Sequence, residues 1–89
     1  MKIAYTKKFD KQLVNLPPKK QDLARAAIKQ FKKDLQTGNS TPSLRRHSLT
    51  GNRKGCDSIS AGGDLRLHYE QIGENIIFVE IGTHSQLYK

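Results

Sequence analysis

The sequence contains one cysteine, no tryptophan and no long apolar run among its 89 residues. Because Cys56 stands alone, an internal disulfide and a cysteine-rich zinc site are both excluded, and such cysteine usage is typical of a reducing compartment. Residues 1–5 lack the apolar segment of a signal peptide, and no stretch approaches the roughly 18 apolar residues that a membrane span needs. We therefore expect a single cytoplasmic domain, residues 1–89, that acts without a membrane.

Acidic side chains are also scarce, since 8 Asp and Glu stand against 16 Lys and Arg and give a formal net charge of +8. The imbalance lies in residues 1–55, which hold 14 basic and 3 acidic side chains, whereas residues 56–89 hold 2 and 5. A basic half on a small domain favours a polyanionic partner, either a nucleic acid or an acidic protein. The alternative is a charge that serves only solubility.

Two helices are expected in the basic half of the chain. Phe9, Leu13 and Leu16 recur at helical spacing through residues 7–15, and Thr6 is a suitable N-cap. Two consecutive prolines end this helix, and the second of them can occupy the first turn of the next. Together the two helices predict a helical hairpin that packs on a sheet.

The second helix is expected to run to about Gln36, where Gly38 can form a left-handed C-cap. Its opposite face is rich in lysine and reads mainly as a solvated surface. Its apolar stripe predicts the face that packs on the core. The stripe consists of Leu23, Ala27, Ile28, Phe31 and Leu35.

Strands account for most of the remaining chain. Residues 2–5 form a short opening strand, and residues 39–53 form an irregular, basic loop. The three later strands are expected at 54–61, 64–70 and 75–81, because polar and apolar residues alternate or form a short apolar run between turn signals. The resulting order, β-α-α-β-β-β, predicts an α+β fold in which a helical hairpin covers a small antiparallel sheet.

Three motifs in the C-terminal half are specific enough to resemble a known family. They are Leu-Thr-Gly-Asn-Arg-Lys-Gly at 49–55, Gly-Asp-Leu-Arg-Leu-His-Tyr at 63–69 and Ile-Gly-Thr-His-Ser-Gln-Leu-Tyr at 81–88. With the two-helix N-terminal half they resemble the RelE/ParE toxin superfamily, and within it the YafQ-like mRNA interferases of type II toxin–antitoxin systems. The resemblance implies a toxin held inactive by a cognate antitoxin. The RelE and YafQ branches cleave messenger RNA on the ribosome, whereas the ParE branch poisons DNA gyrase.

The resemblance also implies roles for particular side chains. His84 matches the catalytic histidine near the C-terminus, and Tyr88 matches the aromatic residue that follows it. His47 matches a histidine in the basic loop, and Asp64 matches an acidic residue at the start of the third strand. Arg66 lies where RelE-type toxins place a phosphate-binding arginine.

The second strand departs from the family pattern. YafQ-like enzymes have a further catalytic histidine and aspartate there, where this chain has Ser60 and Ser58. The full set of YafQ catalytic groups is therefore absent from this sequence.

The residue types fit metal-free cleavage of RNA. Such cleavage needs a base for the 2′-hydroxyl proton, cations for the transition-state charge and an acid for the leaving 5′-oxygen. Histidine serves in either proton role near neutrality, and arginine binds phosphate through paired donors. We expect His84 and His47 to move protons and Arg66 to bind phosphate, with Asp64 and Tyr88 as further catalytic candidates. The expected RNA-binding groups are Arg45, Arg46, Arg53, Lys54 and His68.

Each of these assignments has an alternative. His84 could satisfy a turn, Tyr88 could pack, and His68 could be structural. Arg66 could form an ion pair with Glu80 or Glu70 across the sheet. The histidines lack the spacing and carboxylate partners of a metal site, so neither a metal nor another cofactor is expected.

Two other functions compete with the nuclease. One is a ParE-like toxin that inhibits gyrase, which has no need of the histidine in the Gly-Thr-His ending. The other is a basic nucleic-acid-binding module, for which the chain lacks a recognition helix or an aromatic platform. A ribosome-dependent endoribonuclease toxin is therefore the leading interpretation.

Overall fold

A five-stranded sheet organises the chain, with its strands in the order β1-β5-β4-β3-β2. The structure is a computed structural model that describes residues 1–88. β1 runs parallel to β5, and the other neighbouring strands are antiparallel. The strands are β1 (Ile3–Tyr5), β2 (His47–Ser48), β3 (Asp57–Ser60), β4 (Leu65–Ile72) and β5 (Asn75–Thr83).

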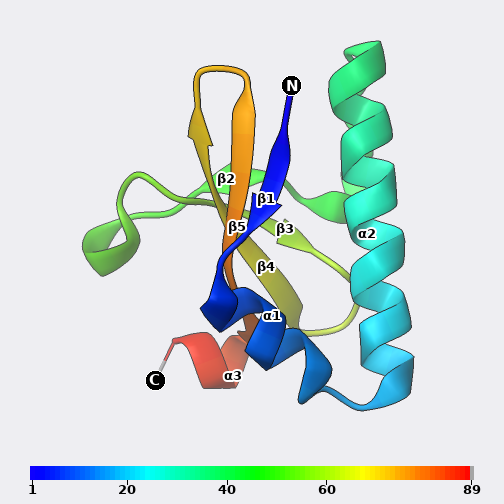
Figure 1. The fold of residues 1–89 in the computed structure, drawn as a ribbon, viewed down its shortest axis with the longest axis vertical. Coiled ribbons are helices and arrows are strands. Elements are labelled where there is room, and N and C mark those ends of the chain that lie inside the picture. The colour runs from blue at the N-terminus through cyan, green and yellow to red at the C-terminus, as the bar shows by residue number, and fades with distance from the viewer. Residues whose placement is uncertain (89) are drawn as a thin grey trace.

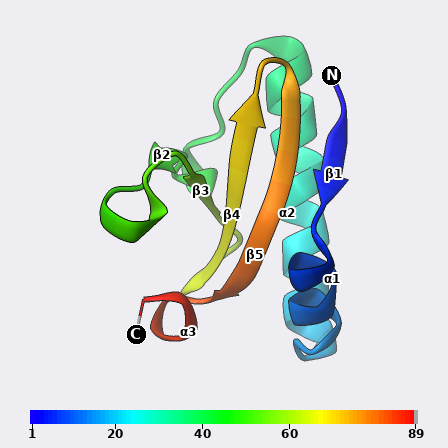
Figure 2. The same cartoon turned by 60° about the vertical axis from the view of Figure 1, so that its left-hand side comes forward.

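Two helices cover one face of this sheet, as Figures 1 and 2 show. They are α1 (Lys7–Val14) and α2 (Pro18–Thr37). The loop with η2 (Gly51–Arg53), next to the edge strand β2, extends away from the helices in Figure 2, whereas η1 (Pro42–Leu44) packs against β3 and places Leu44 in the core. The short helix α3 (His84–Leu87) follows β5. In the described part of the chain, no helix is long and apolar enough to span a bilayer.

The core is an aromatic cluster centred on Phe78 of β5. Its ring centroid lies 5.5 Å from that of Phe9, 5.6 Å from Tyr5, 5.8 Å from Tyr69 and 5.9 Å from Phe31. These rings come from β1, α1, α2 and β4, so one side chain joins both helices to the sheet. Such tilted and offset contacts add to the stabilisation from burial alone.

A β-bulge in β5 sets which face each side chain occupies. His68 pairs with Glu80 but Tyr69 pairs with Phe78, which leaves Val79 as the extra residue. Because side chains alternate along a strand, the bulge reverses the alternation. Phe78 and Ile81 therefore both face the core, and Glu80 faces the opposite side beside His68.

The expected α+β class and order of elements are confirmed, with local differences in where strands begin. The basic loop contains a two-residue strand, β2, which pairs with the edge of β3. β3 begins at Asp57 rather than at residue 54, because turn η2 occupies the residues before it. The chain also forms α3 at its end, where no helix was expected.

The buried face of α2 differs from the predicted stripe. Leu23 was expected on the buried face but is 41% exposed. Ala24, which was not part of the predicted stripe, is fully buried and belongs to the core together with Phe31. Asp34 lies on the buried face as well, where it accepts hydrogen bonds from Thr41 N at 2.8 Å and Thr41 Oγ1 at 2.9 Å. A carboxylate satisfied in this way joins the loop after α2 to the helix, a contact that hydrophobic periodicity does not reveal.

We expect Phe78→Ala to lower the free energy of unfolding by about 3–5 kcal/mol, because it removes the ring that all the other aromatic side chains of the core contact. Urea denaturation followed by circular dichroism measures this loss. The matched control is Val14→Ala, at a side chain that is 64% exposed, for which we expect a change within about 0.5 kcal/mol. A loss below about 1 kcal/mol for Phe78→Ala would contradict the central position of this ring.

Candidate functional site

A polar cleft of about 430 Å³ lies where β2, β4 and α3 meet. Its walls come from the basic loop, the start of β4 and the end of the described chain, segments far apart in the sequence. Most of the predicted catalytic side chains meet here. The lining residues are Arg45, His47, Ser48, Leu49, Thr50, Arg66, His84 and Tyr88.

The cap of α3 positions His84 and Tyr88. Thr83 Oγ1 accepts from Gln86 N at 3.2 Å, and Gln86 Oε1 accepts from Thr83 N at 2.8 Å, which together form a capping box. His84 N donates to Asp64 O at 2.8 Å and so attaches the helix to the start of β4. The rings of His84 and Tyr88 lie 4.5 Å apart as a result.

Gly82 allows this cap to close. A Cβ at this position would lie 3.1 Å from Gln86 Oε1 and 3.3 Å from Leu87 Cδ2. Glycine permits the close approach, and the buried Leu87 then holds α3 against the sheet. The Gly-Thr-His-x-x-Leu-aromatic ending therefore orients the side chains of His84 and Tyr88 towards the cleft.

His47 reaches the cleft from the edge strand β2. Its Nδ1 lies 2.7 Å from the carbonyl oxygen of Arg45, and its side chain is exposed. A carbonyl oxygen only accepts hydrogen bonds, so Nδ1 is the protonated nitrogen of the neutral ring. Nε2 remains available to exchange a proton with a ligand in the cleft.

Arg66 is held by the turn between β3 and β4. Its Nη1 donates to Ser60 Oγ at 3.1 Å, to Gly63 O at 2.9 Å and to Leu65 O at 3.1 Å. Within residues 1–88, Arg66 donates all of its hydrogen bonds from Nη1, and it forms no ion pair with a glutamate across the sheet. The rest of the guanidinium can bind an anion in the cleft.

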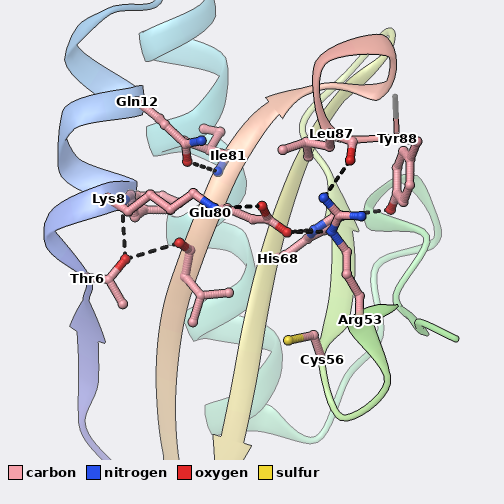
Figure 3. A network of polar contacts seen from close by, with 12 residues as sticks. Thr6, Lys8, Gln12, Arg53, Cys56, His68, Glu80, Ile81, Leu87 and Tyr88 are labelled. Carbon is pink, nitrogen blue, oxygen red and sulfur yellow. Dashed lines mark hydrogen bonds and ion pairs between the residues drawn. The ribbon is translucent and has the colours of Figure 1, made fainter. Parts of the chain in front are cut away.

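Glu80 is the centre of a polar network behind the cleft, drawn in Figure 3. The carboxylate is almost fully buried and accepts from Arg53 Nε at 2.6 Å and His68 Nδ1 at 2.8 Å, with Lys8 Nζ at 3.4 Å. Burial alone would raise the pKa of the Glu80 carboxyl. The hydrogen bonds and charges of Arg53 and His68 outweigh burial and lower that pKa from 4.5 to about 2.

His68 links this network to the cleft. Its Nε2 lies 2.7 Å from the Tyr88 hydroxyl, and its side chain is fully buried. Burial lowers the pKa of the imidazole below 6.5, a shift that Glu80 opposes and that Arg53 and His47 reinforce. The expectation that His68 faces outward to bind RNA is therefore wrong. The loop that carries Arg53 covers this face of the sheet and buries the imidazole.

Two predicted RNA-binding arginines also have internal partners. Arg53 pairs with Glu80, donates to Leu87 O and lies 5.2 Å from the Tyr88 ring centroid, so it supports the site from behind. Arg46 lies over the ring of Phe31, 5.3 Å from its centroid, and is not among the residues that line the cleft.

Two further candidates, Asp64 and Lys54, are exposed and do not line the cleft. Asp64 contributes its main-chain carbonyl to the anchoring of α3. Sequence reasoning missed the central position of Glu80, although a lone carboxylate in the apolar run Ile-Ile-Phe-Val-Glu-Ile was a signal for a buried, paired charge.

Solved structures with the same architecture identify the fold. YafQ from Escherichia coli strain BL21(DE3) superposes with a TM-score of 0.78 at 20% identity, over 98% of this chain and 97% of that one. A chain of the E. coli DinJ–YafQ toxin–antitoxin complex gives 0.76 at 22%, over 98% and 96%. A chain of the RelBE2 toxin–antitoxin complex from Mycobacterium tuberculosis gives 0.63 at 22%, over 93% and 96%. The fold is that of the YafQ- and RelE-type toxins.

The sequence itself gives the narrower assignment. The family model of YafQ, a bacterial toxin of type II toxin–antitoxin systems, matches residues 1–89, and the chain belongs to this family. No curated protein matches the sequence closely enough to count as a relative.

We expect the network to make folding stability fall as the pH is lowered, in two stages. The unfolded chain takes up the His68 proton near pH 6.5, whereas the folded protein takes it up only at lower pH, so stability drops across that interval. The folded-state pKa of Glu80 is about 2 against 4.5, so its contribution is lost between these values. Urea denaturation at a series of pH values measures both stages.

The variant Glu80→Gln tests the second stage. It removes the carboxylate, so the unfolding free energy should be lower than that of wild type at pH 7 and the difference should shrink below pH 4.5. The control is Glu70→Gln on the exposed end of β4. Parallel pH profiles for wild type and Glu80→Gln would show that Glu80 is not the group that titrates.

Proposed function

We propose that this toxin is a metal-independent endoribonuclease that cleaves messenger RNA on the ribosome in the cytoplasm. One observation carries the proposal: His47 on β2, Arg66 on β4, and His84 with Tyr88 at the C-terminal end come from three separate segments and line one cleft. The cleft thus combines proton-transfer groups, a phosphate-binding group and an aromatic ring. These are the groups that cleavage next to a ribose requires.

The reaction is an internal transesterification of RNA. The 2′-oxygen attacks phosphorus, the bond from phosphorus to the 5′-oxygen breaks, and a 2′,3′-cyclic phosphate and a 5′-hydroxyl form. The 2′-hydroxyl proton passes to the enzyme, and the leaving 5′-oxygen receives a proton from it. Water can then open the cyclic ester to a 3′-phosphate. His84 and His47 supply groups that exchange protons, and Asp64 acts as a positioning residue that holds α3 through its carbonyl.

Arg66 binds the scissile phosphate in this proposal. The bonds from Nη1 to Ser60 and to the turn carbonyls fix the guanidinium plane before RNA arrives. A pre-oriented cation stabilises charge that develops in the transition state without reorganising. Arg45 lines the same cleft and, with exposed Lys54, provides positive charge for the flanking phosphates.

A cognate antitoxin is the second partner that we propose. The related E. coli YafQ is found with DinJ, and RelBE2 of M. tuberculosis is also a toxin–antitoxin complex. Residues 1–55 of this chain carry the excess of basic side chains. Such a surface favours an acidic, partly disordered segment that orders on binding.

We expect His84→Ala to lose at least about 100-fold in cleavage rate, because it removes a proton-transfer group at the cleft. The measurement is induction in a bacterium followed by primer extension on an abundant messenger, with wild type beside the variant. New 5′ ends should appear within minutes for wild type and be absent for His84→Ala. Lys33→Ala, at an exposed lysine of α2 away from the cleft, is the matched control and should cleave like wild type.

Two results would contradict the nuclease. Growth arrest by wild type without new 5′ ends, unchanged in His84→Ala, would favour inhibition of gyrase instead. Toxicity in neither protein would leave antitoxin binding as the remaining activity of the fold.

We expect Arg66→Lys to weaken RNA binding about tenfold, because lysine keeps the charge but loses the fork that binds two phosphate oxygens. Fluorescence anisotropy with a 2′-O-methylated oligonucleotide measures binding without cleavage. Lys33→Arg is the control for a charge-conserving change elsewhere. Equal affinity of Arg66→Lys and wild type would show that Arg66 does not contact the phosphate.

A further inference from the structure

One titratable side chain is fully buried and yet bonded to a residue of the cleft. His68 is 0% exposed, and its two ring nitrogens have different partners. Nδ1 lies 2.8 Å from Glu80 Oε2, and Nε2 lies 2.7 Å from the Tyr88 hydroxyl, as Figure 3 shows. Tyr88 itself is 37% exposed and lines the cleft.

These partners determine where the protons are. The Glu80 carboxylate only accepts, so the neutral ring of His68 carries its proton on Nδ1. The Nε2 lone pair then faces the tyrosine hydroxyl, which donates to it. Carboxylate, imidazole and hydroxyl in this order form the arrangement that activates a hydroxyl group in many hydrolases.

We infer that Glu80, His68 and Tyr88 form a proton relay in which the buried His68 is the base for the reaction and Tyr88 is its contact with RNA. The inference rests on the proposed nuclease function and deepens it. His68 cannot touch a substrate because it is buried, so a proton can reach it only through Tyr88.

The Tyr88 oxygen takes the proton of the RNA 2′-hydroxyl while its own proton moves to His68 Nε2. The imidazole becomes an imidazolium paired with the Glu80 carboxylate, and the 2′-oxygen attacks phosphorus. His84 donates a proton to the leaving 5′-oxygen. Solvent exchange afterwards returns His68 to its neutral form and reprotonates His84.

Charged groups from several elements face the imidazole. They are Glu80 on β5, Arg53 of η2 and His47 on β2, with Tyr88 after α3. Burial, together with Arg53 and His47, lowers the pKa of His68, and Glu80 opposes that shift. The ring is thus neutral and ready to accept a proton at neutral pH, and Glu80 is the positioning residue that stabilises the imidazolium once it forms.

Arg53 holds the outer end of the relay in place. Its guanidinium bonds Glu80, donates to the carbonyl of Leu87 and lies over the Tyr88 ring. One cation thereby joins the carboxylate to the segment that carries the hydroxyl. A Tyr88→Phe variant keeps the ring under this cation and removes only the hydroxyl.

The test is single-turnover cleavage of messenger RNA on purified ribosomes as a function of pH. We expect Tyr88→Phe and His68→Gln each to lose at least about 100-fold in rate. Glutamine can donate to Glu80 and accept from Tyr88 but cannot take up the proton, so it separates a relay from a structural hydrogen bond. The double variant should be no slower than either single variant, because the groups act as one unit.

The pH profile provides a readout that a structural role would not change. The wild-type rate should rise with pH through an apparent pKa below 6.5, and this rise should be absent from both variants. Tyr5→Phe, at a tyrosine of the core-facing β1, is the matched control and should keep rate and profile. Urea midpoints of the variants establish that the fold is retained.

The outcomes are distinguishable. Cleavage by His68→Gln within about threefold of wild type, with the same pH profile, overturns the relay and leaves the nuclease standing. No cleavage by wild type overturns the nuclease and the relay together. A ¹⁵N spectrum of the free toxin supports the relay if His68 carries its proton on Nδ1 at neutral pH, and overturns it if Nε2 is protonated instead.

Discussion

The buried carboxylate of Glu80 is the constraint on which the site depends. A charge removed from water must be paired and hydrogen-bonded, and Glu80 has partners on α1, η2 and β4. The pair with Arg53 fixes the loop over the sheet, and the bond to His68 fixes the imidazole. Removing one partner leaves the other charges uncompensated, so the loop, the imidazole and the C-terminal segment are stabilised together.

Core and site are coupled through a single irregularity in β5. The bulge at Val79 allows Phe78 and Ile81 to face the aromatic core while Glu80 faces the other side. Thr6 strengthens it, because its hydroxyl donates to Val79 O and also caps α1. One face of the strand therefore holds the helices, and the other face holds the polar network. Changes in the core around the bulge would alter both faces.

The predicted site residues differ in how local their environments are. The cap that orients His84 and Tyr88 lies within residues 81–88, so their placement depends on a short contiguous motif. The sequence predicted that His68 is exposed, but the side chain is buried. A side chain on the outward face of a strand is exposed only if no other segment covers it. The loop around Arg53 covers that face, and the loop conformation depends on Glu80, which is distant in sequence.

The sequence by itself determined the α+β class, the order of helices and strands, and the membership of the YafQ family. These follow from periodicity, turn residues and contiguous motifs, which act over a few residues. Only the tertiary structure decided which polar groups meet: Ser60 with Arg66, and Glu80 with Arg53 and His68. The physical reason has two parts. The bulge changes which side chains of β5 face the core, and the ion pair between Arg53 and Glu80 holds a loop over the other face of the sheet. Neither the bulge nor the ion pair produces a periodic pattern in the sequence.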